Sequence, residues 1–193
     1  MSENIEYIGP IFPKVNQKFS KPNWWEELED NRPVILINQG TIATDCSELI
    51  LPAIKAFGNQ NFLVIALPVK EEIKNLPVNV KVSEFISFGH LLPYVDVMIT
   101  NGGFGATYMA LSHGIPLVCS GNSEDKKEVG SRVEYTGCGI NLNQLSPSPT
   151  RIKKAVDSIL SNSSYKKQAE KLQAEIRGYN ILNLIINHIN SLI

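Results

Sequence analysis

The chain has few cysteines, and their arrangement excludes two common frameworks of small proteins. Only three occur in 193 residues, at positions 46, 119 and 138. An odd number, with no Cys-x-x-Cys pair and no matching pair of histidines, argues against a zinc site and against a set of disulfides. Cys119 lies in the apolar run IPLVC and is expected to be a small buried hydrophobic residue. The sequence therefore predicts neither a metal nor a cofactor.

Charge of one sign and long apolar runs are also lacking. The net charge is −1 and the pI is about 6.3, which gives no sign of a surface for nucleic acid or anionic lipid. No apolar run approaches the roughly 18 residues of a membrane span. The first ten residues, MSENIEYIGP, do not combine a basic region with an apolar stretch as a signal peptide does. We expect a cytoplasmic protein. Any anion that it binds must be held by the local arrangement of its groups rather than by the overall charge of the protein.

Alternating apolar runs and helical patterns indicate the fold class. Hydrophobic residues make up 43% of the chain, which suits one large domain or at most two small ones. A proline-rich lead-in, with a short helix that carries Trp24, Trp25 and Leu28, is expected over residues 1–33. Strands are predicted at 33–38, 61–67, 80–86, 95–100, 115–120 and 138–142, with helices at 45–58, 106–114 and 125–137 and from 149 onward. This order predicts an α/β protein with a Rossmann-like parallel sheet flanked by helices.

Two helix starts carry local signals. Asp45, with Glu48 three residues later, fits a capping box, while Pro52 predicts a kink or a late start in the same helix. Ser148 followed by Pro149 is typical of a cap and a first helical position.

Two of the predicted strands end in turns that contain glycine, NQGT at 38–41 and TNGGFG at 100–105. In parallel sheets ligands bind outside the carboxyl ends of the strands. Glycine lets the backbone approach a ligand closely, and the first turn of the next helix offers unpaired N–H groups to phosphate oxygens. The alternative is that these glycines only form tight turns. Neither stretch fits the dinucleotide fingerprint or the phosphate loop of nucleotide triphosphatases.

The run from Phe85 to Leu142, FISFGHLLPYVDVMITNGGFGATYMALSHGIPLVCSGNSEDKKEVGSRVEYTGCGINL, resembles the donor-binding signature of GT-B glycosyltransferases. It is most similar to the family of plant UDP-glycosyltransferases and bacterial macrolide glycosyltransferases, and the resemblance covers essentially the whole chain. That family has one Rossmann-like domain for the acceptor and a second for a nucleotide-diphosphate sugar. The chain resembles the second, so it is expected to be one half of a GT-B glycosyltransferase.

The resemblance implies a nucleotide-sugar site. Phe85 stands where an aromatic residue stacks on the nucleobase, although a core phenylalanine at a strand end is the alternative, and Ile86 follows with backbone groups that read the base edge. Asn101 stands where most relatives have a histidine that bonds the pyrophosphate. The remaining backbone positions expected near the donor are Gly40, Thr41, Gly102, Gly103, Phe104, Gly105 and Ala106.

The chain also departs from the family pattern. Met109 replaces a glutamate that commonly binds the ribose hydroxyls, so ribose recognition must come from elsewhere or be weaker. Ser87 and Phe88 replace the usual Pro-Gln pair. Glu124, Asp125 and Lys126 stand where many members have an Asp-Gln pair that faces the sugar. A solvated helix start is the alternative for this acidic stretch.

The resemblance places no catalytic residue in this chain. The general base that deprotonates the acceptor belongs to the absent domain, so His90, His113 and His188 are expected to be structural or exposed. The reaction implied is direct displacement at the anomeric carbon without a metal, with this half holding the leaving group.

The expected function is the donor-binding half of an enzyme that moves a hexose from a UDP- or TDP-sugar to a hydroxyl acceptor. Residues 34–178 are expected to form the nucleotide-sugar domain, and residues 179–193 to pack as a helix on the acceptor domain of the same or a partner chain, or to self-associate. Two alternatives stay open. In the first, the chain is a stand-alone subunit of a split glycosyltransferase. In the second, it is a module that has lost nucleotide binding.

Overall fold

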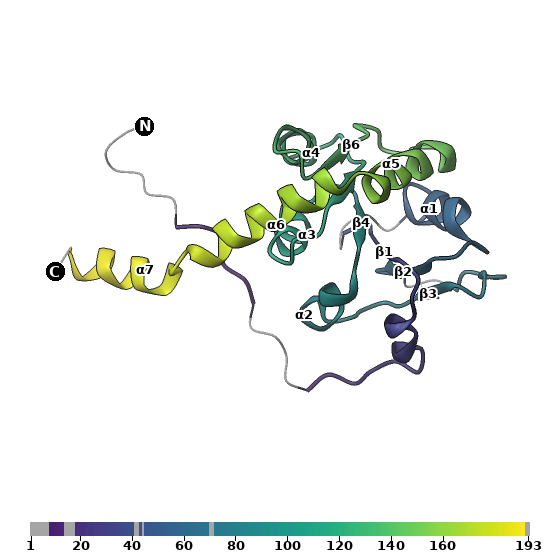
Figure 1. The fold of residues 1–193 in the computed structure, drawn as a ribbon, viewed down its shortest axis with the longest axis horizontal. Coiled ribbons are helices and arrows are strands. Elements are labelled where there is room, and N and C mark those ends of the chain that lie inside the picture. Colours follow the sequence, from purple (N-terminus) through teal and green to yellow (C-terminus); the bar gives the residue numbers. More distant parts are fainter. Residues whose placement is uncertain (1–7, 14–17, 41–42, 44, 70–71, 192–193) are drawn as a thin grey trace.

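The core of the protein is a six-stranded, fully parallel sheet. The computed structural model describes residues 8–13, 18–40, 43, 45–69 and 72–191. The strands are β1 (Val34–Asn38), β2 (Leu63–Leu67), β3 (Val80–Val82), β4 (Val97–Thr100), β5 (Leu117–Cys119) and β6 (Gly139–Asn141). They lie in the order β3-β2-β1-β4-β5-β6 (Figure 1). This is the doubly wound order, in which the direction of winding reverses between β1 and β4. The Rossmann-like prediction is confirmed.

Helices cover both faces of the sheet. One face packs against α1 (Ile50–Phe57) and α5 (Pro149–Ser161). The other packs against the 3₁₀ helix η1 (Trp25–Glu29), α2 (Phe88–Leu91), η2 (Leu92–Tyr94), α3 (Phe104–Leu111), α4 (Lys126–Tyr135) and α6 (Ser163–Gly178). Trp25 and Leu28 are buried on this second face, so part of the expected lead-in packs into the core.

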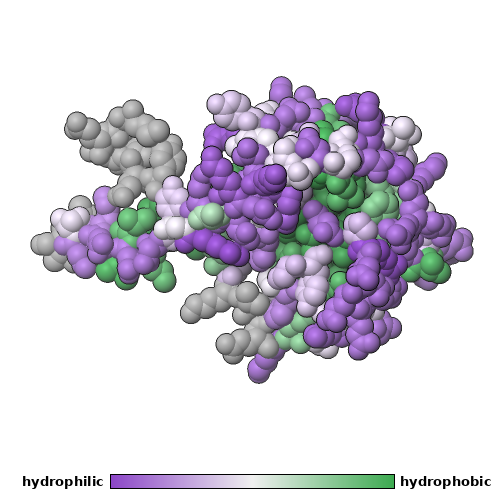
Figure 2. Space-filling view, in the orientation of Figure 1, coloured by the Kyte–Doolittle hydropathy of each residue, from purple (hydrophilic) through white to green (hydrophobic). Residues whose placement is uncertain are grey.

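The last helix, α7 (Ile181–Asn190), extends away from the sheet beyond the end of α6 (Figure 1). None of its residues is buried. Hydrophobic side chains are visible on it in the space-filling view, at the left of the molecule (Figure 2).

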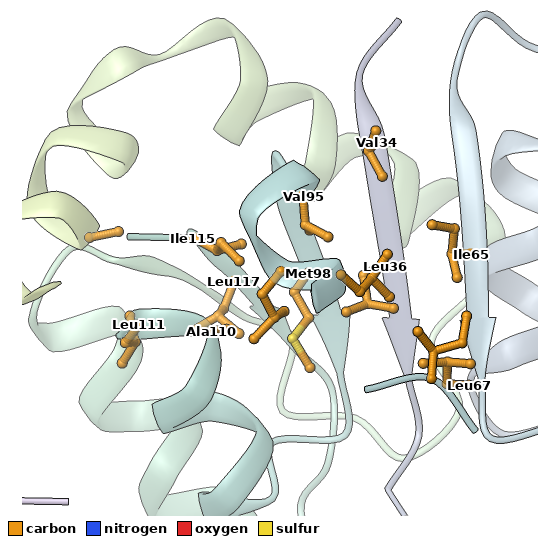
Figure 3. Close-up of a cluster of buried hydrophobic side chains, with 14 of the residues drawn as sticks. Val34, Leu36, Ile65, Leu67, Val95, Met98, Ala110, Leu111, Ile115 and Leu117 are labelled. Atoms are coloured by element: carbon orange, nitrogen blue, oxygen red, sulfur yellow. The ribbon is translucent and has the colours of Figure 1, made fainter. Parts of the chain in front are cut away.

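The strands are buried on both faces because their sequences are almost wholly apolar. All five residues of β1 are buried, and successive side chains enter opposite clusters. Val34 and Leu36 join the cluster beneath α3, where Ile65, Met98 and Leu117 from the neighbouring strands meet them (Figure 3). Ile35 and Ile37 point instead toward α1 and α5.

The two predicted helix starts had opposite outcomes. α1 begins only at Ile50, so the predicted capping box at Asp45 was wrong. The late start that Pro52 predicted is confirmed. The Asp45 carboxylate instead accepts a hydrogen bond from the Ser47 N–H (2.8 Å) and so forms a turn before the helix. At α5, Ser148 Oγ accepts from the Arg151 N–H (3.3 Å), as predicted.

Candidate functional site

A cavity of about 1000 Å³ opens at the carboxyl ends of the central strands. Its walls come from the loops after β1 and β4, the first turn of α3, the loop between β3 and α2, and the loop between β5 and α4. The cavity therefore lies at the switch point of the sheet, where parallel α/β proteins bind ligands.

Most residues predicted for the site line this one cavity. They are Gly40, Phe85, Ile86, Asn101, Gly103, Phe104, Gly105, Ala106, Glu124, Asp125 and Lys126. Gly102 lies just behind the wall, and its N–H donates to Thr100 Oγ1 (3.2 Å). Thr41 lies outside the described residues.

The first turn of α3 presents backbone N–H groups to the cavity. The helix begins at Phe104, its N-cap is Gly103, and no side chain caps it. The N–H groups of Phe104, Gly105 and Ala106 consequently have no partner within the helix. Together with the helix dipole they form a site suited to phosphate oxygens.

Gly102 and Gly105 differ in backbone conformation and surroundings. Gly102 has φ +85°, so the turn alone accounts for that glycine. Gly105, in contrast, is helical, and an added Cβ would meet no atom within 4 Å. Glycine inside a helix costs about 0.5–1 kcal/mol relative to alanine. The packing around Gly105 does not require a glycine at this position.

Asn101 joins the two glycine turns. It is 9% exposed, its amide nitrogen donates to the Gln39 carbonyl, and its Oδ1 accepts from the Gly103 N–H (3.2 Å). Gly40, with φ +84°, packs so closely that an added Cβ would lie 3.0 Å from the Asn101 amide nitrogen. Asn101 thus fixes the loop after β1 against the loop after β4, at the edge of the cavity.

Phe85 occupies an exposed position at the cavity wall. β3 ends at Val82 rather than at the predicted 86, so Phe85 lies in a loop with its side chain 79% exposed. The alternative of a core phenylalanine is wrong. Ile86, next to it, is 3% exposed and anchors the loop in the core beneath α3. The Ser83 hydroxyl donates to the Phe85 carbonyl (3.0 Å) and shapes the loop further.

The loop before α4 carries charged groups at the other side of the cavity. Glu124 has φ +54° and forms an ion pair with Lys126. Asp125 occupies the N-cap position of α4, but its carboxylate makes no cap bond. The acidic stretch is therefore exposed at a helix start, as the solvated alternative predicts, and it also faces the cavity.

Some cavity residues were not predicted for the site. Ser112 and His113 follow Gly105 at helical spacing, so periodicity along α3 was the signal that could have found them. Met109, at the position where the resemblance implies ribose recognition, lines the cavity beside them. His113 Nδ1 lies 2.9 Å from the Met109 carbonyl, which can only accept, so Nδ1 carries the hydrogen. Phe12 and Pro13 also line the cavity, and nothing in the local sequence connects them to it.

The described residues hold neither a metal cluster nor a helix suited to span a membrane. No group of histidine, cysteine, aspartate and glutamate side chains among them is placed to hold a metal ion. Within that same part of the chain, none of the helices has the length and apolar character that crossing a membrane requires.

Comparisons with known proteins agree on one family. Residues 48–183 match the family model described as erythromycin biosynthesis protein CIII-like, C-terminal domain. The chain is 39% identical over 91% of its length to 4'-demethylrebeccamycin synthase of Lentzea aerocolonigenes, and 34% identical over 96% to UDP-glucosyltransferase A1 of Starmerella bombicola. It spans only 42% and 41% of these relatives.

A solved structure shares the fold. The structure of a spinosyn rhamnosyltransferase complexed with thymidine diphosphate superposes with a TM-score of 0.78 at 19% identity, covering 88% of this chain and 48% of that one. The fold is therefore that of one half of a larger glycosyltransferase.

Proposed function

Because the chain belongs to the family of erythromycin biosynthesis protein CIII-like C-terminal domains, we propose that it binds the nucleotide-diphosphate-sugar donor of a glycosyltransferase. The observation that carries the proposal is the cavity at the switch point, where the first turn of α3 offers backbone N–H groups beside a glycine that the fold does not need. The printed names of relatives support both donor classes, since one is a UDP-glucosyltransferase and one solved neighbour holds thymidine diphosphate.

We propose that the ligand spans the cavity from Phe85 to Asp125. The exposed ring of Phe85 stacks on the base, with Ile86 backbone groups at the base edge. The pyrophosphate meets the N–H groups of Phe104, Gly105 and Ala106. Asn101 contributes through the loop that it fixes and through its second amide hydrogen. Glu124, Asp125 and Lys126 then face the sugar, while the neighbouring loop with Gly40 and Thr41 approaches the donor from the other side.

The chemical role of this half follows from that placement. An acceptor hydroxyl oxygen attacks the anomeric carbon, and the bond from that carbon to the diphosphate oxygen breaks, with its electron pair staying on the diphosphate. Preorganised N–H groups at the α3 N-terminus stabilise the charge that develops on this leaving group. The proton of the acceptor passes to a base on the acceptor-binding half, since none of the proposed site residues here serves as that base.

The acceptor-binding half is the proposed partner, in the same chain or a separate cytoplasmic one. The chain spans less than half of the relatives compared above. The exposed apolar residues of α7, namely Leu182, Ile186 and Ile189, are a suitable surface for such a partner. This surface suits an acceptor half in the same chain and one in a separate chain alike.

Calorimetric titration with UDP, dTDP and UDP-glucose tests the proposal. We expect binding of the diphosphates and no sugar transfer to simple hydroxyl acceptors by the chain alone. Transfer is expected only after mixing with the acceptor half from the same genome. An absence of nucleotide binding by the folded chain would contradict the proposal and favour a module that has lost this activity. Turnover by the chain alone would show that it is not a half enzyme.

A further inference from the structure

The cavity includes a segment to which the proposed function assigns no role. Phe12 and Pro13 belong to the lead-in before the first strand, yet they line the same cavity as Phe85 and Met109. Phe12 is partly exposed, so its ring is accessible from the cavity. Its neighbour Ile11 is 70% exposed and does not line the cavity. Phe12 therefore lines the cavity, whereas Ile11 does not.

The backbone before Phe12 is held against the end of α6. Gly9 has φ +82°, and an added Cβ would lie 2.9 Å from Tyr179 Cγ. The lead-in therefore crosses the α6–α7 junction in close contact with it, as the ribbon also shows (Figure 1). Pro10 and Pro13 restrict φ on both sides of Phe12, which lowers the entropy cost of holding its ring in place.

The later part of the lead-in is fixed next to the proposed base-binding loop. The Phe19 ring stacks on His90 with centroids 4.4 Å apart and planes 15° from parallel, and it meets Trp25 edge-on at 4.9 Å. His90 belongs to α2, which directly follows the loop that carries Phe85, and its Nδ1 lies 3.0 Å from Ser87 Oγ. The part of the lead-in around Phe19 is consequently anchored beside the loop that carries Phe85.

We infer that Phe12 is a ligand-binding residue whose ring packs against the nucleoside part of a pyrimidine nucleoside diphosphate. The inference rests on the proposed function. A ring face in an apolar, partly enclosed position suits the flat base or the carbon face of the sugar attached to it. The segment expected to be a linker is then part of the binding site.

The test compares Phe12→Ala with Ile11→Ala in calorimetric titrations with UDP and dTDP, which lack a transferable sugar. Phe12→Ala is expected to weaken both affinities by about 5- to 150-fold, the range that corresponds to loss of one base–aromatic contact. Ile11→Ala is expected to bind like the wild type, and Phe12→Tyr, which retains the ring, to restore most of the affinity.

The outcomes separate this inference from the proposed function. Wild-type binding with an unchanged affinity of Phe12→Ala would overturn the role of Phe12 alone. No binding by the wild type would overturn both. If Phe12→Ala loses its cooperative thermal transition, Phe12→Leu decides instead, because it retains apolar volume without a ring. An affinity of Phe12→Leu equal to that of the wild type would then overturn the inference.

Discussion

At the residue scale, Asn101 has a structural role in addition to the ligand-binding role that its place in the family motif implies. Its side chain is a donor at one end and an acceptor at the other, and it uses both, toward the Gln39 carbonyl and the Gly103 N–H. The same amide therefore links two strand ends. Its direct contact with pyrophosphate stays a prediction.

Phe85 gives the most direct test of base recognition. Replacing it with alanine is expected to weaken UDP or dTDP binding by about 1–3 kcal/mol, because a stacked aromatic contact is lost. Stability is expected to change little, since the ring is 79% exposed. Tyr135→Ala is the matched control, because that aromatic is 92% exposed on α4 and does not line the cavity. Equal affinities of the two variants would contradict stacking at Phe85.

Buried thiols predict how stability depends on pH. Burial, with a smaller effect from Glu134, raises the pKa of the Cys119 thiol to about 12. In the unfolded chain a cysteine has a pKa of about 8.5, so above that pH only the unfolded state releases this proton. The contribution of Cys119 is therefore complete below that pH and lost as pH rises toward 12.

Denaturant titrations between about pH 8 and 10 measure this loss, which reaches about 1.4 kcal/mol per pH unit above the unfolded pKa. Cys119→Ala is expected to show a shallower decline of the unfolding free energy than the wild type. The slope is compared rather than the absolute value, because the substitution also leaves a small cavity. Parallel slopes would show that Cys119 does not stay protonated in the folded protein.

At the element scale, α5 depends on the residue that caps its N-terminus. Ser148 Oγ accepts the Arg151 N–H (3.3 Å), and Pro149 occupies the first turn. Ser148→Ala is expected to lower the free energy of unfolding by about 0.5–2 kcal/mol, the usual cost of losing an N-cap. Ser158→Ala, within the same helix, is the control, since its hydroxyl only bonds back to Lys154. A thermal melt in which both variants match the wild type would contradict the cap.

The elements themselves were largely predictable because they depend on local pattern. The four apolar residues that open β1 and the apolar positions at helical spacing in α5 encode their own burial. The errors in the predicted bounds arose where contacts with other segments determine where a helix begins or a strand ends. Asp45 has the chemistry of a cap, yet α1 starts later, since the backbone turns around that carboxylate first. β3 pairs with β2 over three residues and ends at Val82, and Phe85 follows in a loop.

At the scale of the whole molecule, the cavity could be predicted only in part. Local signals place the glycine turns at strand ends, so the part of the cavity that is proposed to bind phosphate could be predicted. Phe12 could not be found in this way, because its approach to the cavity depends on packing of Gly9 against Tyr179 at the far end of the chain. Contacts between segments so distant in sequence leave no periodic pattern.

The last prediction concerns the exposed apolar face of α7. Leu182, Ile186 and Ile189 of α7 are 73%, 52% and 53% exposed and lie at helical spacing on one side. Exposed apolar surface of this kind favours association with a partner or with a second copy of the chain. Replacing all three with serine is expected to reduce self-association in sedimentation experiments while leaving the thermal midpoint almost unchanged, because they are not buried in their own domain.

Val78→Ser is the control, because Val78 is 85% exposed and lies outside α7, and it is expected to change neither property. Equal self-association of the wild type and the triple variant would show that α7 is not the associating surface, and a lower midpoint would show that α7 stabilises its own domain.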